Sequence, residues 1–265
     1  MALIEVQDLK KDYLIAQKKA GIGGTIKHLI HPVYRKKEAV KGISFSIQEG
    51  ESVAFLGANG AGKSTTIKML TGIMKPGSGC ISVMGKNPFE KRIENAKNIG
   101  VVFGQKTQLW WDIPIIETFQ LLKNIYEIPE EKYQKNMKEF CEILELNEFL
   151  DQPARKLSLG QRVRADLAAS LLHEPPVLFL DEPTIGLDVA VKQKIYAFLR
   201  KINKEKKTTI LLTSHDLNDL ESLCQRLIIL ERGKILFDDK MDKIFEQYEE
   251  GITLEQIVIQ LFERR

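Results

Sequence analysis

The stretch from Gly57 to Thr65 restricts the fold of this chain more than any other feature. It reads Gly-Ala-Asn-Gly-Ala-Gly-Lys-Ser-Thr, which fits the pattern G-x-x-x-x-G-K-[ST]. An apolar run from Ser52 to Leu56 precedes it, and a run with helical spacing from Lys63 to Leu70 follows it. A strand, a glycine-rich loop and a helix in this order predict a loop whose backbone N–H groups surround phosphate oxygens.

We predict that this loop binds the phosphates of a nucleoside triphosphate. In such loops the lysine reaches the terminal phosphates and the residue after it ligates Mg²⁺, so these roles fall to Lys63 and Ser64. The predicted phosphate-binding residues are Gly57, Ala58, Asn59, Gly60, Ala61, Gly62, Lys63, Ser64 and Thr65. An accidental glycine-rich turn is the alternative, and the loop alone does not separate kinases, GTPases and motors.

A second motif is an apolar strand that ends in two carboxylates. The sequence Val-Leu-Phe-Leu-Asp-Glu runs from Val177 to Glu182. At the carboxyl end of such a strand, Asp181 can support Mg²⁺ through a water, and Glu182 can polarise the water that attacks the terminal phosphate. The alternative interpretation is a pair of surface acids at a strand end. Beside the phosphate-binding loop, the pair predicts triphosphate hydrolysis.

The segment Leu157–Gln161 narrows the class of nucleotide protein. A GTPase would carry N-K-x-D, and the nearest match, Asn203 to Lys206, lacks the aspartate. The segment reads Leu-Ser-Leu-Gly-Gln, and here the chain resembles the ABC ATPase family, whose signature is L-S-G-G-Q. Ser158, Gly160 and Gln161 match the signature and Leu159 departs from it. Ser158 and Gln161 also form a capping box that any helix can use, and the two interpretations are compatible.

The resemblance extends over nearly the whole chain and implies roles for four more positions. Tyr13 is similar to the aromatic residue that stacks on adenine, and Gln105 to the glutamine that approaches Mg²⁺ and links the nucleotide to the membrane partner. Asp188 ends a Gly-Leu-Asp match to the loop that meets the other subunit, and His215 matches the switch histidine that touches the terminal phosphate. The alternatives are an ordinary strand-end tyrosine for Tyr13 and a structural histidine for His215.

The implied activity is ATP hydrolysis to ADP and phosphate, coupled to transport. In this family two ATPase subunits pair head to tail, and each site combines the phosphate loop of one chain with the signature of the other. The implied catalytic residues are Lys63, Glu182 and His215, and the implied metal ligands are Ser64, Gln105 and Asp181. The implied partners are a second copy of the chain and separate integral membrane permease subunits, and the overall pattern resembles bacterial export ATPases. The alternative is a soluble ABC ATPase that acts on ribosomes or DNA.

Two segments are candidates for contact with those partners. Residues 109–114, Leu-Trp-Trp-Asp-Ile-Pro, place two tryptophans beside Gln105 and suit an interface, unless both rings pack inside a helical lobe. A basic insertion at roughly 16–38 carries apolar residues at helical spacing and predicts a short amphipathic element. It could meet lipid or the permease, or form a solvated loop.

The remaining pattern predicts an α/β fold with a P-loop NTPase core. Strands that alternate with helices favour a largely parallel sheet, and alternating residues near Leu3–Leu9 and Ile43–Ile47 favour an antiparallel N-terminal β portion. We expect one nucleotide-binding domain over 1–265, with an inserted helical subdomain at roughly 108–172 and a C-terminal helical extension at roughly 240–265. Residues 115–146 are expected to be helical with a break at Pro129, and the last thirty or so residues to be helical.

Composition limits the setting. The formal net charge is +3, which gives no general case for nucleic-acid binding, and no nucleic-acid partner is expected. The longest apolar runs are far below the roughly 20 residues that span a bilayer. The three scattered cysteines and the lack of a secretory signal pattern at the N-terminus indicate a reducing compartment. We therefore expect the chain at the cytoplasmic face of the membrane, held there by the permease.

Overall fold

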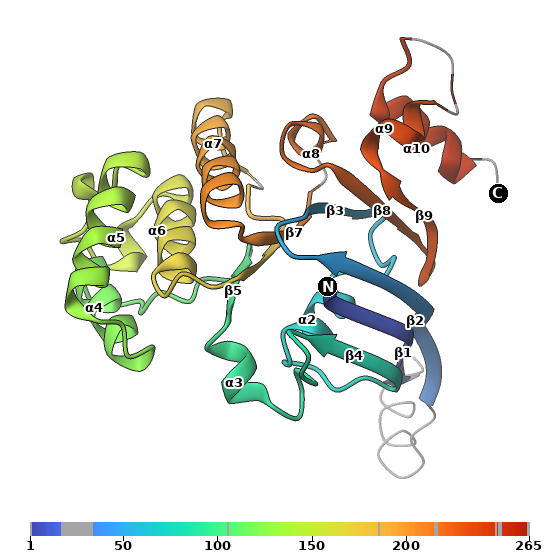
Figure 1. Ribbon diagram of the computed structural model, residues 1–265, viewed down its shortest axis with the longest axis horizontal. Helices are drawn as coiled ribbons and strands as arrows, with labels where there is room; N and C mark the ends of the chain where they lie inside the picture. Colours follow the sequence, from blue (N-terminus) through green and yellow to red (C-terminus); the bar gives the residue numbers. More distant parts are fainter. Residues whose placement is uncertain are drawn as a thin grey trace, which may run out of the picture.

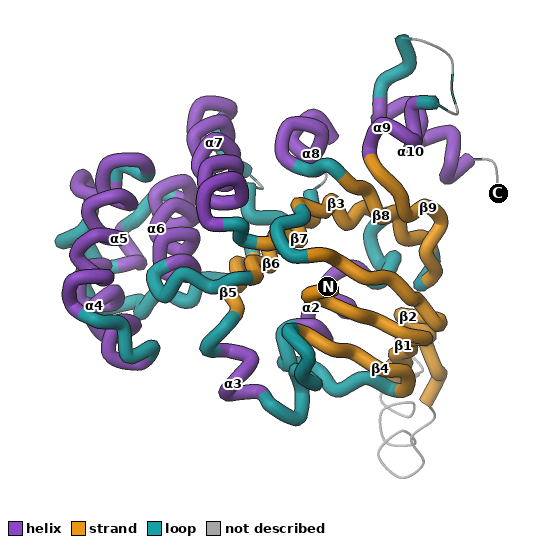
Figure 2. The backbone as a smooth tube through the Cα atoms, in the orientation of Figure 1, coloured by secondary structure: helices purple, strands orange, loops and turns teal. Residues whose placement is uncertain are grey.

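The structure is a computed structural model that describes residues 2–16, 34–104, 106–184, 186–214, 217–246, 248 and 251–263. Two sheets form its frame (Figures 1 and 2). An antiparallel three-stranded sheet has the order β2-β1-β4, and a six-stranded sheet has the order β5-β6-β7-β3-β8-β9. The bounds of the first sheet are β1 Ala2–Ala16, β2 Tyr34–Gln48 and β4 Ser78–Val83.

The six-stranded sheet is parallel except at one edge. Its strands are β3 Ser52–Gly57, β5 Ile99–Phe103, β6 Val177–Asp181, β7 Thr209–Thr213, β8 Arg226–Glu231 and β9 Lys234–Lys240. Only β9 runs antiparallel, against β8. All six residues of β3 are buried, which is the reason its sequence is a continuous apolar run rather than an alternating one. The largely parallel core predicted from the sequence is confirmed.

Helices lie around and beyond these sheets. They are α2 Lys63–Leu70, α3 Arg92–Ala96, α4 Ile115–Ile125, α5 Glu130–Ile143, α6 Leu159–Leu171, α7 Val189–Lys206, α8 Leu217–Leu223, α9 Met241–Phe245 and α10 Leu254–Glu263, with 3₁₀ turns at Leu146–Glu148 and Ala154–Lys156. Helices α4, α5 and α6 form a lobe on the side of the six-stranded sheet away from the antiparallel sheet (Figure 1). Within the described residues, no helix combines the length and apolar composition that a membrane crossing requires.

The two sheets are joined by a shared core. Buried residues of β1 and β2, such as Ile4, Val6 and Ile47, belong to the same cluster as Phe55 of β3 and Ile67 of α2. A second cluster runs from the other side of the large sheet into the helical lobe, where Phe119, Phe140 and Phe149 are almost completely buried. Helix α2, which begins at the phosphate-binding loop, therefore lies in the hydrophobic core and is held firmly.

Three strands and the ends of the basic insertion differ from the predictions. The expected helical structure near residue 235 is wrong, because β9 pairs with β8 there; α9 and α10 follow it. Strands β4 and β5 were not predicted. Residues 34–38, expected in the insertion, extend β2, and residue 16 extends β1. The rest of the insertion, residues 17–33, lies outside the described residues.

Candidate functional site

The phosphate-binding loop borders a cavity of about 530 Å³ between the glycine-rich turn and the β1–β2 hairpin. Most of the loop that the sequence predicts is part of its wall, together with Glu182, the predicted catalytic base. The cavity is lined by Tyr13, Leu14, Ile15, Lys37, Ala39, Asn59, Gly60, Ala61, Gly62, Lys63, Ser64, Thr65 and Glu182. The structure therefore brings Tyr13, in β1, and Glu182, just after β6, to the same loop although they lie far apart along the chain.

Two of the loop glycines are fixed by close backbone contacts. A Cβ atom on Gly57 would lie 2.4 Å from the carbonyl oxygen of Leu230, and one on Gly62 would lie 2.7 Å from that of Ala39. Both glycines also have positive φ, at 155° and 113°. The loop is thus pressed between β8 and β2, where only glycine fits.

Lys63 is buried at the start of α2. Its side chain is 6% exposed, and its Nζ donates hydrogen bonds to the carbonyl oxygens of Gly57 at 2.5 Å and Ala58 at 3.4 Å. Burial lowers the pKa of this ammonium, and the charges of Glu182 and Asp181 oppose that shift. A buried cation that stands beside the loop N–H groups is well placed to attract phosphate.

A second cavity of about 330 Å³ adjoins the first, and Ser64 and Glu182 line both. The second is lined by Ser64, Lys68, Ile73, Phe103, Gly104, Lys106, Asp181 and Glu182. The Ser64 hydroxyl and the Glu182 carboxylate therefore meet where the two cavities join, and Asp181 lines the second cavity beside them. The terminal phosphate of a nucleotide bound in the loop would lie at this position.

Thr213, at the end of β7, holds the side chain of Asp181 and the backbone of Glu182. Its hydroxyl donates to Asp181 Oδ1 at 2.8 Å, and the backbone N–H of Glu182 donates to the Thr213 hydroxyl oxygen at 3.0 Å and to its carbonyl oxygen at 3.1 Å. Glu182 has a φ of 54°, an uncommon conformation for a residue with a side chain. Such backbone strain is concentrated at functional sites. The β7 neighbour thus fixes the Asp181 carboxylate and the backbone from which the Glu182 side chain projects.

Tyr13 is fixed against the phosphate-binding loop. Its Oη lies 3.2 Å from Thr65 Oγ1 and donates to Met74 Sδ at 3.2 Å. These contacts hold the phenol end and leave the ring as part of the cavity wall. In the β1–β2 register Tyr13 stands opposite Lys37, a residue that the sequence patterns did not single out.

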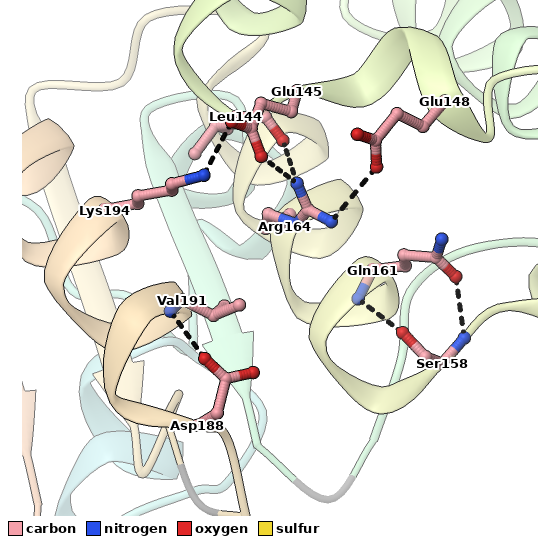
Figure 3. A network of polar contacts seen from close by, with 9 residues as sticks. All are labelled: Leu144, Glu145, Glu148, Ser158, Gln161, Arg164, Asp188, Val191 and Lys194. Atoms are coloured by element: carbon pink, nitrogen blue, oxygen red, sulfur yellow. Dashed lines mark hydrogen bonds and ion pairs between the residues drawn. The ribbon is translucent and has the colours of Figure 1, made fainter.

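The signature segment begins α6 and has the predicted capping box (Figure 3). The Gln161 N–H donates to Ser158 Oγ at 3.2 Å, and the Ser158 N–H donates to Gln161 Oε1 at 2.9 Å. Leu159 is the first helical residue, so the departure from the signature requires no unusual backbone there. Its side chain is 42% exposed.

Asp188 begins α7 next to the start of α6. Its Oδ1 accepts the N–H of Val191 at 2.9 Å (Figure 3). A Cβ atom on Gly160 would lie 3.8 Å from the Val191 side chain. The described residues that line the two cavities include neither Asp188 nor the signature residues. Within one chain, then, the predicted nucleotide residues form two separate groups.

Sequence reasoning missed the contacts of Asp166, a buried carboxylate on α6. Its Oδ1 accepts hydrogen bonds from the Thr107 hydroxyl at 2.9 Å and the Gln108 N–H at 3.0 Å. Burial raises the pKa of Asp166 to about 6, although both hydrogen bonds and the charge of Arg162 lower it. The signal that could have identified this residue in the sequence was an acid among the apolar residues of α6.

Of the predicted site residues, Gln105 and His215 lie outside the described residues.

Comparison with known proteins assigns the chain to a family. The family model described as "ABC transporter" matches residues 40–185, which is more than half of the chain. The chain belongs to the ABC transporter family. It is an ATP-binding subunit of that family, an ABC ATPase that converts ATP and water to ADP and phosphate.

Two relatives and one solved structure of ABC proteins are similar to the chain. It is 35% identical to the Nod factor export ATP-binding protein I of Ralstonia nicotianae, over 78% of this chain and 64% of that protein. It is 34% identical to the energy-coupling factor transporter ATP-binding protein EcfA2 of Clostridium perfringens, over 84% and 79% of the two chains. The dimeric post-hydrolysis structure of the ATP-binding cassette MJ0796 with ADP and Pi has a TM-score of 0.74 and 27% identity, and the match covers 90% of this chain and 98% of that one.

Proposed function

We propose that two copies of this ABC ATPase bind ATP head to tail, with each nucleotide between the phosphate-binding loop of one copy and the signature segment of the other. The observation that carries this proposal is the separation of the two groups within one chain. Ser158 and Gly160 lie outside both cavities, at the N-terminal end of α6. The positive end of a helix favours an anion, and a second copy can bring it to the phosphate. The ADP- and Pi-bound dimer of the related cassette MJ0796 supports the arrangement.

Hydrolysis in this arrangement falls to Glu182, which lines both cavities, and to Lys63, which lines the first. Glu182 accepts a proton from the attacking water, and Lys63 stabilises the negative charge that develops on the terminal phosphate. His215 is proposed to contact the same phosphate, and Tyr13 to stack on the base. Closure of the pair orders these groups around ATP, and loss of the terminal phosphate removes the preference for the closed state.

The donor set near Ser64 fits Mg²⁺. The Ser64 hydroxyl and the Asp181 carboxylate line the same cavity, and hard oxygen donors of this kind suit a small divalent cation. No group of three or more His, Cys, Asp or Glu side chains within the described residues could hold a metal alone. That agrees with Mg²⁺, which is commonly bound by one or two protein groups together with phosphates. When bound, the ion would neutralise charge on the phosphates, and Gln105 is proposed as a further ligand.

Glu182→Gln tests the hydrolysis mechanism. The amide keeps the size of the side chain but cannot accept the proton of the attacking water, so turnover should fall by a factor of about 100 or more. ATP-dependent pairing, measured by sedimentation, should persist because the phosphate contacts remain. Undiminished hydrolysis by the purified variant would eliminate Glu182 as the base.

We infer that the exposed tryptophans of residues 109–114 dock on the permease. Trp110 is 42% exposed and Trp111 is 48% exposed, whereas their neighbour Leu109 is buried and anchors the segment. Rings packed inside the helical lobe would be covered, so this exposure favours the interface interpretation. Half-exposed aromatic side chains next to an anchored residue are typical of binding surfaces.

Trp111→Ala tests this docking surface in cells that contain the permease. We expect weaker association with the membrane partner while the ATPase activity of the isolated subunit remains. Equal loss of thermal stability and of association would instead indicate a structural role for the ring.

We also propose that the transporter is an exporter and that the permease holds this subunit at the cytoplasmic face of the membrane. Support for export comes from the relative named for Nod factor export. Co-purification from detergent-solubilised membranes should recover an integral membrane protein. Recovery of ribosomes or DNA in its place would favour the soluble alternative, an ABC ATPase that acts on a macromolecule.

A further inference from the structure

The segment that carries the two tryptophans is fastened to the signature helix by Asp166. This carboxylate is only 6% exposed, and its Oδ1 accepts hydrogen bonds from the Thr107 hydroxyl and the Gln108 N–H. The Gln108 Nε2 donates in return to the backbone carbonyl of Asp166 at 3.0 Å. The Thr107 hydroxyl oxygen also accepts the Leu109 N–H at 3.1 Å. Residues 106–112 are here called the tryptophan segment. The start of this segment is therefore attached to the turn of α6 that carries Asp166.

A second contact lies on the same face of α6. The guanidinium of Arg162 lies over the ring of Trp111, 4.9 Å from its centroid. Arg162 and Asp166 are four residues apart and so point to the same side of the helix. Both ends of the tryptophan segment thus contact α6, one through hydrogen bonds and the other through a cation–π contact.

The opposite face of α6 is also held. Arg164 is two residues from Asp166, about 200° around the helix, and its Nη1 donates to the carbonyl oxygen of Leu144 at 2.9 Å and to Glu145 at 3.1 Å (Figure 3). Glu145 also accepts from Lys194 of α7 at 2.6 Å. Helix α6 is therefore fastened on two sides and can transmit a displacement along its length.

We propose that Asp166 is a positioning residue that transmits engagement of the signature segment by ATP to the tryptophan segment. This inference rests on the proposed function, because it requires the signature to meet a nucleotide. Ser158 and Asp166 are eight residues apart on one helix, a distance of about 12 Å. A shift at the N-terminal end of α6 is carried to Thr107 and Gln108 by the shared hydrogen bonds, and so reaches the surface proposed to meet the permease.

The chain supplies its own probe for this movement. Trp110 and Trp111 are its two tryptophans, so intrinsic tryptophan emission reports on this segment alone. In the Glu182→Gln chain, which should retain the ATP-bound pair, we expect ATP to change this emission and ADP to change it less. Sedimentation of the same samples measures pairing separately.

Asp166→Leu removes the hydrogen-bond acceptor and replaces it with an apolar side chain of similar size. In the Glu182→Gln background we expect the ATP-induced change in emission to fall about fivefold or more, because the hydrogen bonds that Asp166 accepts from Thr107 and Gln108 are lost. Pairing should stay within about twofold of the parent. Asp166→Asn keeps an oxygen acceptor and should restore most of the emission change.

Ser170→Ala is the matched control, because Ser170 is a buried polar residue on the same helix whose hydroxyl donates only to Leu167 of its own helix. It should leave the emission change at the parent value. Thr107→Val removes one of the two donors from the other side and should give an intermediate loss. If Asp166→Leu does not fold, the comparison of Thr107→Val with Ser170→Ala decides the question.

The outcomes separate the two proposals. A full emission change in Asp166→Leu, or in Thr107→Val where the first does not fold, overturns the role of Asp166 and leaves the paired ATP site intact. If the parent chain pairs with ATP but its emission does not change, the role of Asp166 is again overturned and the paired ATP site is not. A parent chain that neither pairs nor changes its emission with ATP overturns both proposals.

Discussion

Lys37 enters the nucleotide cavity through strand register rather than through a motif. It stands opposite Tyr13 in the β1–β2 hairpin and lines the same cavity, two residues from Ala39, which contacts the phosphate-binding loop. Because Lys37 lines this cavity, its ammonium can reach the phosphates of a nucleotide that binds there. The sequence could not predict this because several register shifts interrupt the β1–β2 pairing.

Lys37→Met should weaken ATP binding about fivefold, because an exposed ammonium contributes a modest charge-assisted contact to phosphate. Binding of adenosine, which has no phosphate, should not change. Lys36→Met is the matched control: Lys36 is adjacent, forms an ion pair with Asp12 at 2.8 Å and does not line this cavity. Equal effects of the two substitutions in a nucleotide titration would contradict the assignment.

His173, at the end of the signature helix, should make stability depend on pH. Burial lowers the pKa of this imidazole to about 4, with a further contribution from the Lys132 charge, although the hydrogen bond with the Ile99 carbonyl opposes the shift. Its ring stacks on Tyr126 at 4.0 Å. Because the unfolded chain binds the proton more tightly, its ordinary pKa being 6.5, stability is lost as the pH falls from about 6.5 to 4.

The comparison of wild type with His173→Gln isolates this contribution. The free energy of unfolding in urea should fall more steeply with decreasing pH in the wild type, by up to about 3 kcal/mol over the whole window. Above pH 7 the two pH dependences should be parallel. The same acid dependence in both proteins would mean that folding does not lower the pKa of His173.

At the scale of elements, strong local signals predicted structure well and weak ones did not. The break at Pro129 is confirmed, since α4 ends at Ile125 and α5 begins at Glu130. The apolar runs of β3, β6 and β7 were also identified. Strand β9 was missed because its residues are mostly half-buried and carry charges, and it is specified by pairing with β8 rather than by its own pattern. Strand β4 is likewise specified by its partner β1.

The capping box at Ser158 should serve stability and ATP-dependent pairing together. Ser158→Ala should lower the free energy of unfolding by about 1 kcal/mol and also weaken pairing, because the serine is proposed to contact phosphate. Helix α10 offers a matched control with the same motif: Thr253 and Gln256 exchange hydrogen bonds at 3.0 and 3.3 Å. Thr253→Ala should cost similar stability without changing pairing, and an equal loss of pairing would argue against the phosphate contact.

At the scale of the whole molecule, the sequence predicted one half of the site better than the other. The carboxyl ends of β3 and β6 lie at the same edge of a parallel sheet, separated only by β7, so Lys63 and Glu182 converge for a topological reason. The separation of Ser158 from that edge depends on how the helical lobe packs, which no local pattern encodes. The Asp166 contacts depend on the same packing.

Mixing two inactive chains tests the head-to-tail site most directly. Lys63→Ala disables the phosphate-binding loop and Gly160→Asp places a negative charge in the signature, at a position where a Cβ atom meets only ordinary contacts. Each variant alone should be inactive, and an equimolar mixture should recover up to about a quarter of wild-type ATPase activity, because half of the pairs then hold one intact composite site. A mixture as inactive as its components would contradict a nucleotide site shared between two copies.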